Sequence, residues 1–270
     1  MSNLFNIKDL VVVVTGGTGV LGAAISKYLA DQGTKVVVLG RDTQAGERII
    51  EEIAANGGDA IFLATDVLNR EVLESNKRSI VEEYGRIDVL LNGAGGNMAG
   101  ATIQPDGTIF DLDESAFSQV VDLNLLGTVL PTKVFSEVMV KSGRGIVVNF
   151  CSESALRPLT RVVGYSAAKA AIASFTKSLA GEFAIKFGER FRVNAITPGF
   201  FLTHQNRSLL TNPDGSYTQR AKDIIAHTPF RRFGTPEELF GTIHYLISDA
   251  SAFVTGTLAV VDGGFDAFSI

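Results

Sequence analysis

The sequence has little cysteine and little histidine, and both shortages exclude kinds of site. One cysteine among 270 residues, Cys151, permits no internal disulfide and no zinc site built from cysteines. His227 and His244 show no ligand-like spacing, so we predict no metal.

Excess positive charge and long apolar runs are also missing. The net charge of −5 and the pI near 5.3 argue against a nucleic-acid partner. No apolar run approaches the roughly 20 residues of a membrane span. Residues 1–9 lack the basic region and apolar run of a secretory signal. We therefore expect a cytoplasmic protein with neither a nucleic-acid nor a membrane partner.

The chain has instead ample apolar sequence, arranged in a regular alternation. A hydrophobic share of 46% with 20% charged residues supports a large core, and no composition break divides the chain, so we expect one domain over 1–270. Apolar runs of strand length occupy 11–14, 36–39, 60–64, 89–91, 146–150, 191–196 and 258–261. Helix-compatible stretches separate them at 21–29, 44–55, 71–84, 114–140 and 164–186.

Continuous rather than alternating apolar strands predict burial on both faces. Strands that alternate with helices predict right-handed crossovers and a doubly wound, parallel seven-stranded sheet, which is an α/β fold. The segment 200–233 interrupts this order and contains the turn sequence 212–215 (Asn-Pro-Asp-Gly). We expect it to form a substrate loop.

A glycine-rich loop joins the first strand to the first helix. Glycines in this place let the backbone approach a pyrophosphate, which the helix N-terminus attracts. We expect a nicotinamide dinucleotide to contact Thr15, Gly16, Thr18, Gly19, Val20, Leu21 and Gly22.

The end of the second strand bears on the choice between NAD and NADP. An acidic side chain there would hold the ribose diol, whereas a basic one would meet a 2′-phosphate. Arg41 could do the second and Asp42 the first. The sequence favours NADP over NAD, with both open.

Tyr165 and Lys169 stand four residues apart in a helical segment, so their side chains share one face. A tyrosine with a pKa near 10 needs a nearby cation to act as a base at neutral pH, and the lysine ammonium can supply it. Ser152 follows a strand end, where open α/β sheets bind ligands, and can hold a substrate carbonyl. We predict carbonyl–alcohol chemistry.

With these motifs the chain resembles the short-chain dehydrogenase/reductase family over essentially its whole length, which implies a single-domain Rossmann fold. The resemblance implies that Asn124 holds a water relaying protons from Lys169, so that Asn124, Ser152, Tyr165 and Lys169 form the catalytic group. It also implies cofactor contacts from Tyr165 and Lys169 themselves and from Asp66, Val67, Asn92, Gly93, Ala94, Pro198, Gly199, Phe201 and Thr203.

Two positions depart from the family pattern. Val20 stands where the short members carry glycine, and the segment 92–96 reads Asn-Gly-Ala-Gly-Gly rather than beginning Asn-Asn-Ala-Gly. Gly96 and Asn97 could therefore open room beside the substrate.

Five short sequence segments resemble the branch of D-mannonate oxidoreductases (fructuronate reductases), which is similar to gluconate 5-dehydrogenases. They lie at 95–97, 110–112, 157–160, 198–207 and 227–229. This implies a sugar acid as the small-molecule substrate. Such a substrate needs many hydrogen-bond partners and a cation for its carboxylate. The candidates are Gly96, Asn97, Ser154, Arg157, His204 and Asn206, with Arg207 as a second cation.

Two other functions stay open. A 3-oxoacyl thioester reductase would use the same catalytic residues, and a non-catalytic NAD(P)-binding regulatory protein would keep only the cofactor site. The resemblance further implies a homotetramer that pairs the helical segments 114–140 and 164–186.

Overall fold

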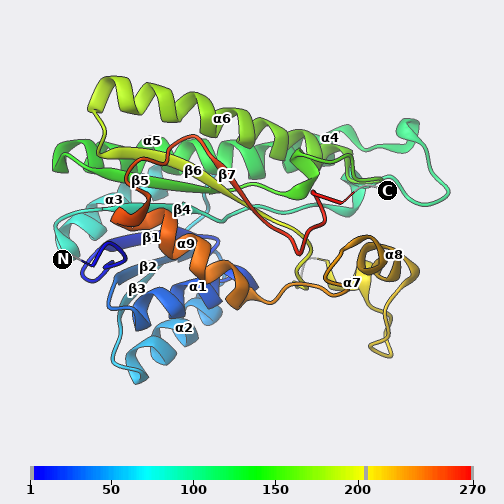
Figure 1. The fold of residues 1–270 in the computed structure, drawn as a ribbon, viewed down its shortest axis with the longest axis horizontal. Helices are drawn as coiled ribbons and strands as arrows, with labels where there is room; N and C mark the ends of the chain where they lie inside the picture. Colours follow the sequence, from blue (N-terminus) through cyan, green and yellow to red (C-terminus); the bar gives the residue numbers. More distant parts are fainter. Residues whose placement is uncertain (1–2, 204–205, 269–270) are drawn as a thin grey trace.

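The computed structural model describes residues 3–203 and 206–268. Within these residues seven strands form one parallel sheet in the order β3-β2-β1-β4-β5-β6-β7 (Figure 1). The strands are β1 (Val11–Thr15), β2 (Lys35–Gly40), β3 (Asp59–Ala64), β4 (Val89–Asn92), β5 (Gly145–Phe150), β6 (Phe191–Pro198) and β7 (Leu258–Val261). The predicted α/β fold is confirmed.

Helices cover both faces of the sheet, as the apolar strands require (Figure 1). One face carries α1 (Val20–Asp31), α2 (Thr43–Ala55) and α9 (Phe240–Ile247), and the other carries α3 (Arg70–Tyr84), α5 (Gly127–Ser142) and α6 (Val163–Phe187). Alternate residues of β1 serve the two cores: Val12 and Val14 pack toward α1, and Val11 and Val13 toward α3.

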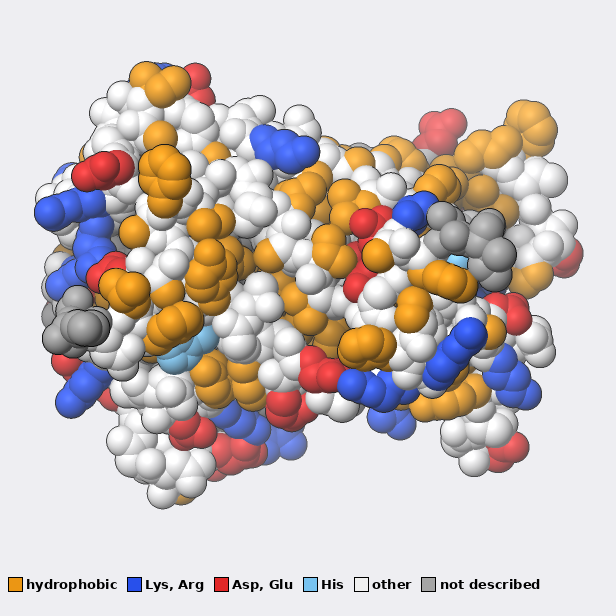
Figure 2. All heavy atoms as spheres, in the orientation of Figure 1, with side chains coloured by type: hydrophobic (Ala, Val, Ile, Leu, Met, Phe, Trp, Pro, Cys, Tyr) orange, Lys and Arg blue, Asp and Glu red, His pale blue; other side chains and the backbone are white. Residues whose placement is uncertain are grey.

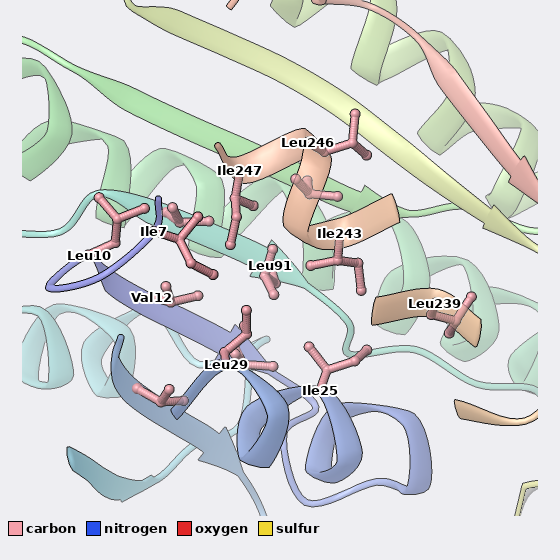
Figure 3. Close-up of a cluster of buried hydrophobic side chains, with 14 of the residues drawn as sticks. Ile7, Leu10, Val12, Ile25, Leu29, Leu91, Leu239, Ile243, Leu246 and Ile247 are labelled. Carbon is pink, nitrogen blue, oxygen red and sulfur yellow. The ribbon is translucent and has the colours of Figure 1, made fainter. Parts of the chain in front are cut away.

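The core beneath α1 and α9 packs the N-terminal part of the chain against its C-terminal part. Figure 3 shows Ile25 and Leu29 of α1 pointing toward Val12 of the sheet and toward Ile243 of α9. Helix α9 was not predicted, although its apolar residues recur at helical spacing. Its burial over β5 and β6 supports the strands that carry the site.

The predicted helix 114–140 is divided. Helix α4 (Glu114–Val121) passes through a π-helical turn, η3 (Asp122–Leu126), before α5 begins. Asn124 lies in this turn, and π turns occur mostly as single insertions near functional sites. By length and composition 114–142 could span a membrane, with half of its most apolar window buried. Since α5 packs on α3, β4 and β5, the burial explains its apolar character.

The segment predicted as a substrate loop contains α7 (Arg207–Leu210) and α8 (Gln219–His227), which project beyond the sheet in Figure 1. A small apolar cluster of Leu210, Ala221, Ile224 and Phe233 gives it a core of its own. On the face drawn in Figure 2, basic and acidic side chains are interspersed.

Candidate active site

The site lies at the carboxyl ends of β1 and β4. These two strands are neighbours, and the chain runs outward from them in opposite directions along the sheet. Such a switch point leaves a crevice between the loops that follow the strands. Two adjoining cavities occupy it, a cofactor cleft of about 380 Å³ and a catalytic cavity of about 240 Å³.

The glycine loop shapes the wall of the cofactor cleft. Gly16 turns the chain with φ 66°, and Gly19 caps α1 without any side-chain hydrogen bond. A Cβ on Gly22 would collide with the Gly16 carbonyl oxygen, so the loop closes only around glycine. The first N–H groups of α1 have no partner within the helix and can donate hydrogen bonds to a bound anion. This geometry fits a dinucleotide pyrophosphate.

Most of the predicted cofactor residues line one of the two cavities. The cleft is lined by Gly16, Thr18, Gly19, Val20, Leu21, Gly22, Arg41, Asp42, Asp66, Val67, Gly93, Ala94 and Thr203. The catalytic cavity adds Tyr165, Lys169, Pro198, Gly199 and Phe201. The cleft also includes Gly95, the last residue of the predicted cofactor segment 92–95, together with Gly40, Thr65 and Leu123, for which no cofactor contact was predicted.

Of the predicted cofactor residues, Thr15 and Asn92 do not line the cleft, because both are buried behind its wall. The Thr15 hydroxyl accepts a hydrogen bond from the Ala94 N–H (3.1 Å), which ties the loop after β4 to β1. The Asn92 amide donates to Thr132 Oγ1 (2.8 Å) and Asn149 Oδ1 (2.9 Å). Both residues thus position the cleft rather than line it.

Arg41 and Asp42 are exposed at the adenosine end of the cleft. The Asp42 carboxylate accepts a hydrogen bond from the Ala45 N–H (2.9 Å) and so caps α2. Arg41 makes no hydrogen bond or ion pair with the described part of the chain.

The structure brings Ser152, Tyr165 and Lys169 together in the catalytic cavity. Ser152 follows β5, whereas the other two lie in α6, one turn apart. Lys169 Nζ donates to the Phe150 carbonyl (2.7 Å) and lies 5.5 Å from the centre of the Tyr165 ring. The lysine is thereby held against the tyrosine ring.

Burial controls the protonation of this pair. It raises the pKa of Tyr165 to about 12, against the opposing effect of a hydrogen bond with Ser152. Burial likewise lowers the pKa of Lys169 to about 8. The tyrosine therefore keeps its proton at neutral pH and is ready to act as an acid. Lys169 is not among the groups that shift the pKa of Tyr165, so the lowering expected from its ammonium is not observed.

Asn124 is fully buried beside the pair. Its amide donates to the carbonyls of Gly96 (2.6 Å) and Val120 (2.8 Å), and its Oδ1 accepts from the Gly96 N–H (3.1 Å). A Cβ on Gly95 would lie 2.6 Å from Asn124 Oδ1 and 3.4 Å from Lys169 Nζ. The two polar groups therefore meet at a backbone that only glycine can form.

The predicted substrate residues fall into two groups. Gly96, Asn97 and Asn206 line the catalytic cavity, with the Asn97 amide bonded to Thr102 Oγ1 (2.9 Å) and that of Asn206 to the Phe201 carbonyl (2.7 Å).

The other group does not line the cavity. Ser154 bonds to Ser152 Oγ (3.1 Å), and Arg157 Nε pairs with Asp266 (2.8 Å). The Arg157 guanidinium, which was predicted to bind the substrate carboxylate, is therefore engaged by Asp266. Arg207 is exposed and lies outside the lining as well. His204 lies outside the described residues.

Two further residues bear on the site: Arg220 was not predicted, and Glu153 was expected only to be a helix-start or loop carboxylate. Arg220, in the first turn of α8, lines the catalytic cavity. Glu153 is buried beside Ser152, and neither carboxylate oxygen has a hydrogen-bond partner in the described part of the chain. Burial, with repulsion from Asp262 and Asp266, raises its pKa to about 8. No local pattern marks either residue, because their surroundings come from distant segments.

Within 3–203 and 206–268 no cluster of His, Cys, Asp or Glu could hold a metal ion.

Comparisons with known proteins agree with this site. Residues 10–214 match the short chain dehydrogenase family model. An uncharacterised oxidoreductase of Bacillus subtilis is 44% identical over 98% of this chain and 97% of its own. A 3-oxoacyl-[acyl-carrier-protein] reductase of Synechocystis is 35% identical over 96% and 97%.

Among solved structures, a protein from Haemophilus influenza provisionally described as a D-mannonate oxidoreductase, with bound NAD, superposes with a TM-score of 0.90. It is 40% identical, over 98% of this chain and 97% of its own. The chain belongs to the short-chain dehydrogenase family and is an NAD(P)-dependent oxidoreductase acting on CH–OH groups.

Proposed function

We propose that the protein transfers a hydride reversibly between NAD(P)H and a keto or hydroxyl group of a sugar acid, such as D-fructuronate and D-mannonate. The observation that carries the proposal is the catalytic cavity: Ser152, Tyr165 and Lys169 meet in it, and the charged side chains of its described lining are both cations. The similarity to the structure described as a D-mannonate oxidoreductase supports the same substrate class.

Each catalytic residue of the cavity has its own role toward the substrate oxygen. Ser152 Oγ donates a hydrogen bond to the carbonyl oxygen and holds it beside the Tyr165 hydroxyl. Because Tyr165 is protonated at neutral pH, it donates the proton to that oxygen in reduction. A bound nicotinamide supplies or accepts the hydride. Lys169, next to the ring, stabilises the phenolate that remains and can return a proton to it.

We place Asn124 in this group as a positioning residue. Its amide is used by the backbone of Gly96 and Val120, so it fixes the Gly95–Gly96 wall next to Lys169 Nζ. The proton relay through a water held by Asn124 stays part of this proposal.

For the cofactor we favour NADP(H). Asp42 already caps α2, whereas Arg41 is exposed at the cleft with its guanidinium available for a 2′-phosphate. Replacing Arg41 by Leu should lower kcat/KM for NADPH about tenfold and leave that for NADH within twofold, since one charge-assisted contact is lost. An equal effect on both cofactors would refute this preference.

A parallel turnover assay tests the substrate class. NADH and NADPH are each offered with D-fructuronate, 5-ketogluconate and deoxy-ketouronates, and Tyr165→Phe serves as the inactive control. We expect turnover with at least one keto acid. Binding of NAD(P)H without reduction of any carbonyl would support the non-catalytic alternative.

The 3-oxoacyl thioester reductase remains the second candidate because the cavity lining includes the apolar residues Leu159, Val162, Phe200, Leu209 and Leu210. The similarity to the Synechocystis reductase points the same way. Acetoacetyl-CoA in the same assay separates the two. Turnover of the thioester with none of the keto acids would overturn the sugar-acid proposal.

We also propose a homotetramer in the cytoplasm, as the family resemblance implies. Exposed Phe110, Leu126 and Phe253 offer apolar surface for contacts between copies. Light scattering on the purified protein gives the mass, and a monomer would refute the assembly.

A further inference from the structure

Arg220 occupies an unusual place for an arginine. It lies in the first turn of α8 and lines the same cavity as Tyr165. Together with Lys169 it supplies the charge of the described lining, which includes no Asp or Glu. The cavity therefore has a cation at its catalytic end and another on the projecting segment.

The surroundings of Arg220 oppose its charge. Partial burial, followed by the nearby positive charge of Arg161, lowers the pKa of its guanidinium. The N-terminal turn of a helix is also the end at which a cation is disfavoured. No ion pair links Arg220 to a carboxylate of residues 3–203 or 206–268. Local stability does not explain an arginine here.

The N–H donors of the Arg220 guanidinium are only partly used by the described part of the chain. Its Nη1 and Nη2 reach Thr160 Oγ1 (3.4 Å) and the Thr160 carbonyl (3.3 Å), both long for N–H···O bonds. Its Nε–H has no partner in the described part of the chain. A guanidinium has five N–H donors in a fork that matches a carboxylate, so a bidentate anion can still bind.

We propose that Arg220 binds the carboxylate of the substrate and thereby makes the enzyme select keto acids over neutral ketoses. The inference depends on the proposed function and names the residue that recognises the acid. An anion bound here would weaken the repulsion between Arg220 and Arg161. It would also offset the cost of burying the guanidinium charge and the cost of placing a cation at the helix N-terminus.

The other arginines near the site fit this role less well. Arg157 is paired with Asp266 and does not line the cavity. Arg207 is exposed on α7, outside the lining. Arg161 uses its Nε on the Ile103 carbonyl (2.9 Å) and its Nη2 on Gln104 Oε1 (3.2 Å).

The test replaces Arg220 by Met, which keeps much of the side chain's length and apolar stem. Lys222→Met is the matched control, because it removes an exposed cation of the same helix that does not line the cavity. Turnover of D-fructuronate is compared with that of D-fructose, which lacks the carboxylate. Independently of turnover, binding of D-gluconate and of D-glucitol to the NADP⁺-loaded protein is measured by calorimetry.

We expect Arg220→Met to lower kcat/KM for D-fructuronate and the affinity for D-gluconate by about ten- to a hundredfold, the loss typical of a charge-assisted bond. D-Fructose turnover, D-glucitol binding and the Kd of NADPH should stay within twofold, and Arg220→Lys should recover part of the loss. Lys222→Met should match wild type.

Two results overturn the inference while the proposed function stands. One is wild-type selectivity for D-fructuronate in Arg220→Met, and the other is an equal loss for charged and neutral ligands, which would mean that Arg220 only holds α8 on Thr160. If the wild type reduces no keto acid and does not bind D-gluconate, the proposed function fails, and the inference fails with it.

Discussion

Glu153 allows the energetic cost of a buried carboxyl beside the catalytic serine to be measured. It is 1% exposed, and neither oxygen has a hydrogen-bond partner in the described part of the chain. Its pKa rises from an ordinary value near 4.5 to about 8 in the folded protein. Because the folded state keeps the proton that the unfolded chain releases, stability is lost as the pH rises from about 4.5 to about 8.

The full slope is about 1.4 kcal/mol for each pH unit, but it is smaller near each of the two pKa values, so the loss between pH 5 and pH 8 is about 3 kcal/mol. Glu153→Gln has nearly the same shape and cannot ionise. We therefore expect the variant and the wild type to unfold at similar urea concentrations at pH 5, and the variant to be more stable by about 3 kcal/mol at pH 8.

Urea unfolding followed by fluorescence or circular dichroism, at half-unit steps from pH 5 to pH 8.5, gives both curves. Glu47→Gln is the matched control, since Glu47 is exposed on α2 and should leave the curve parallel to wild type. Parallel curves for Glu153→Gln would refute the reasoning, because they would show that Glu153 ionises in the folded protein as readily as in the unfolded chain.

Two further substitutions test the glycine loop and the C-terminal segment. Gly22→Ala should weaken NADPH binding at least tenfold and cost about 1–3 kcal/mol of stability, because its Cβ collides with the Gly16 carbonyl. Gly181→Ala in α6, with open space at its Cβ, should bind NADPH normally, and equal binding by both variants would contradict the expectation. Arg157→Met should speed amide hydrogen exchange of residues 262–268 by releasing Asp266, while kcat/KM for D-fructuronate stays within threefold. A loss as large as that expected for Arg220→Met would return Arg157 to the substrate site.

The strands and the catalytic pair could be predicted because their signals are local. Val11 to Val14 form a β-branched run that a buried parallel strand requires. The spacing of Tyr165 and Lys169 places them on one helix face wherever the helix lies. The glycine loop was recognisable because its place between a strand and a helix is part of the motif.

The predicted site residues that do not line either cavity have partners far away in the sequence. Arg157 was predicted to meet a carboxylate, and the structure supplies one from Asp266, 109 residues later, instead of from a substrate. Asn92 matches a cofactor motif, yet its amide is used by Thr132 and Asn149. Arg220 gave no signal because α8 brings it to the cavity only once the segment has folded on its own apolar cluster.

The division of α4 from α5 was equally out of reach. Residues 114–140 have a continuous helical pattern, and a π turn inserts one residue without changing composition. Within this turn Asn124 bonds to the backbone of Gly96, a contact across 28 residues that no local pattern reveals. Helix periodicity can therefore place the element but not the turn that aims Asn124 at the site.

The most direct test of hydride transfer assisted by Tyr165 is the turnover of Tyr165→Phe, which removes only the hydroxyl. With the keto acid that the wild type reduces best, kcat should fall by about a hundredfold or more, the usual contribution of a positioned acid. The Kd of NADPH should stay within twofold. Wild-type kcat in this variant would contradict the central claim and transfer the proton-donating role to another group of the cavity.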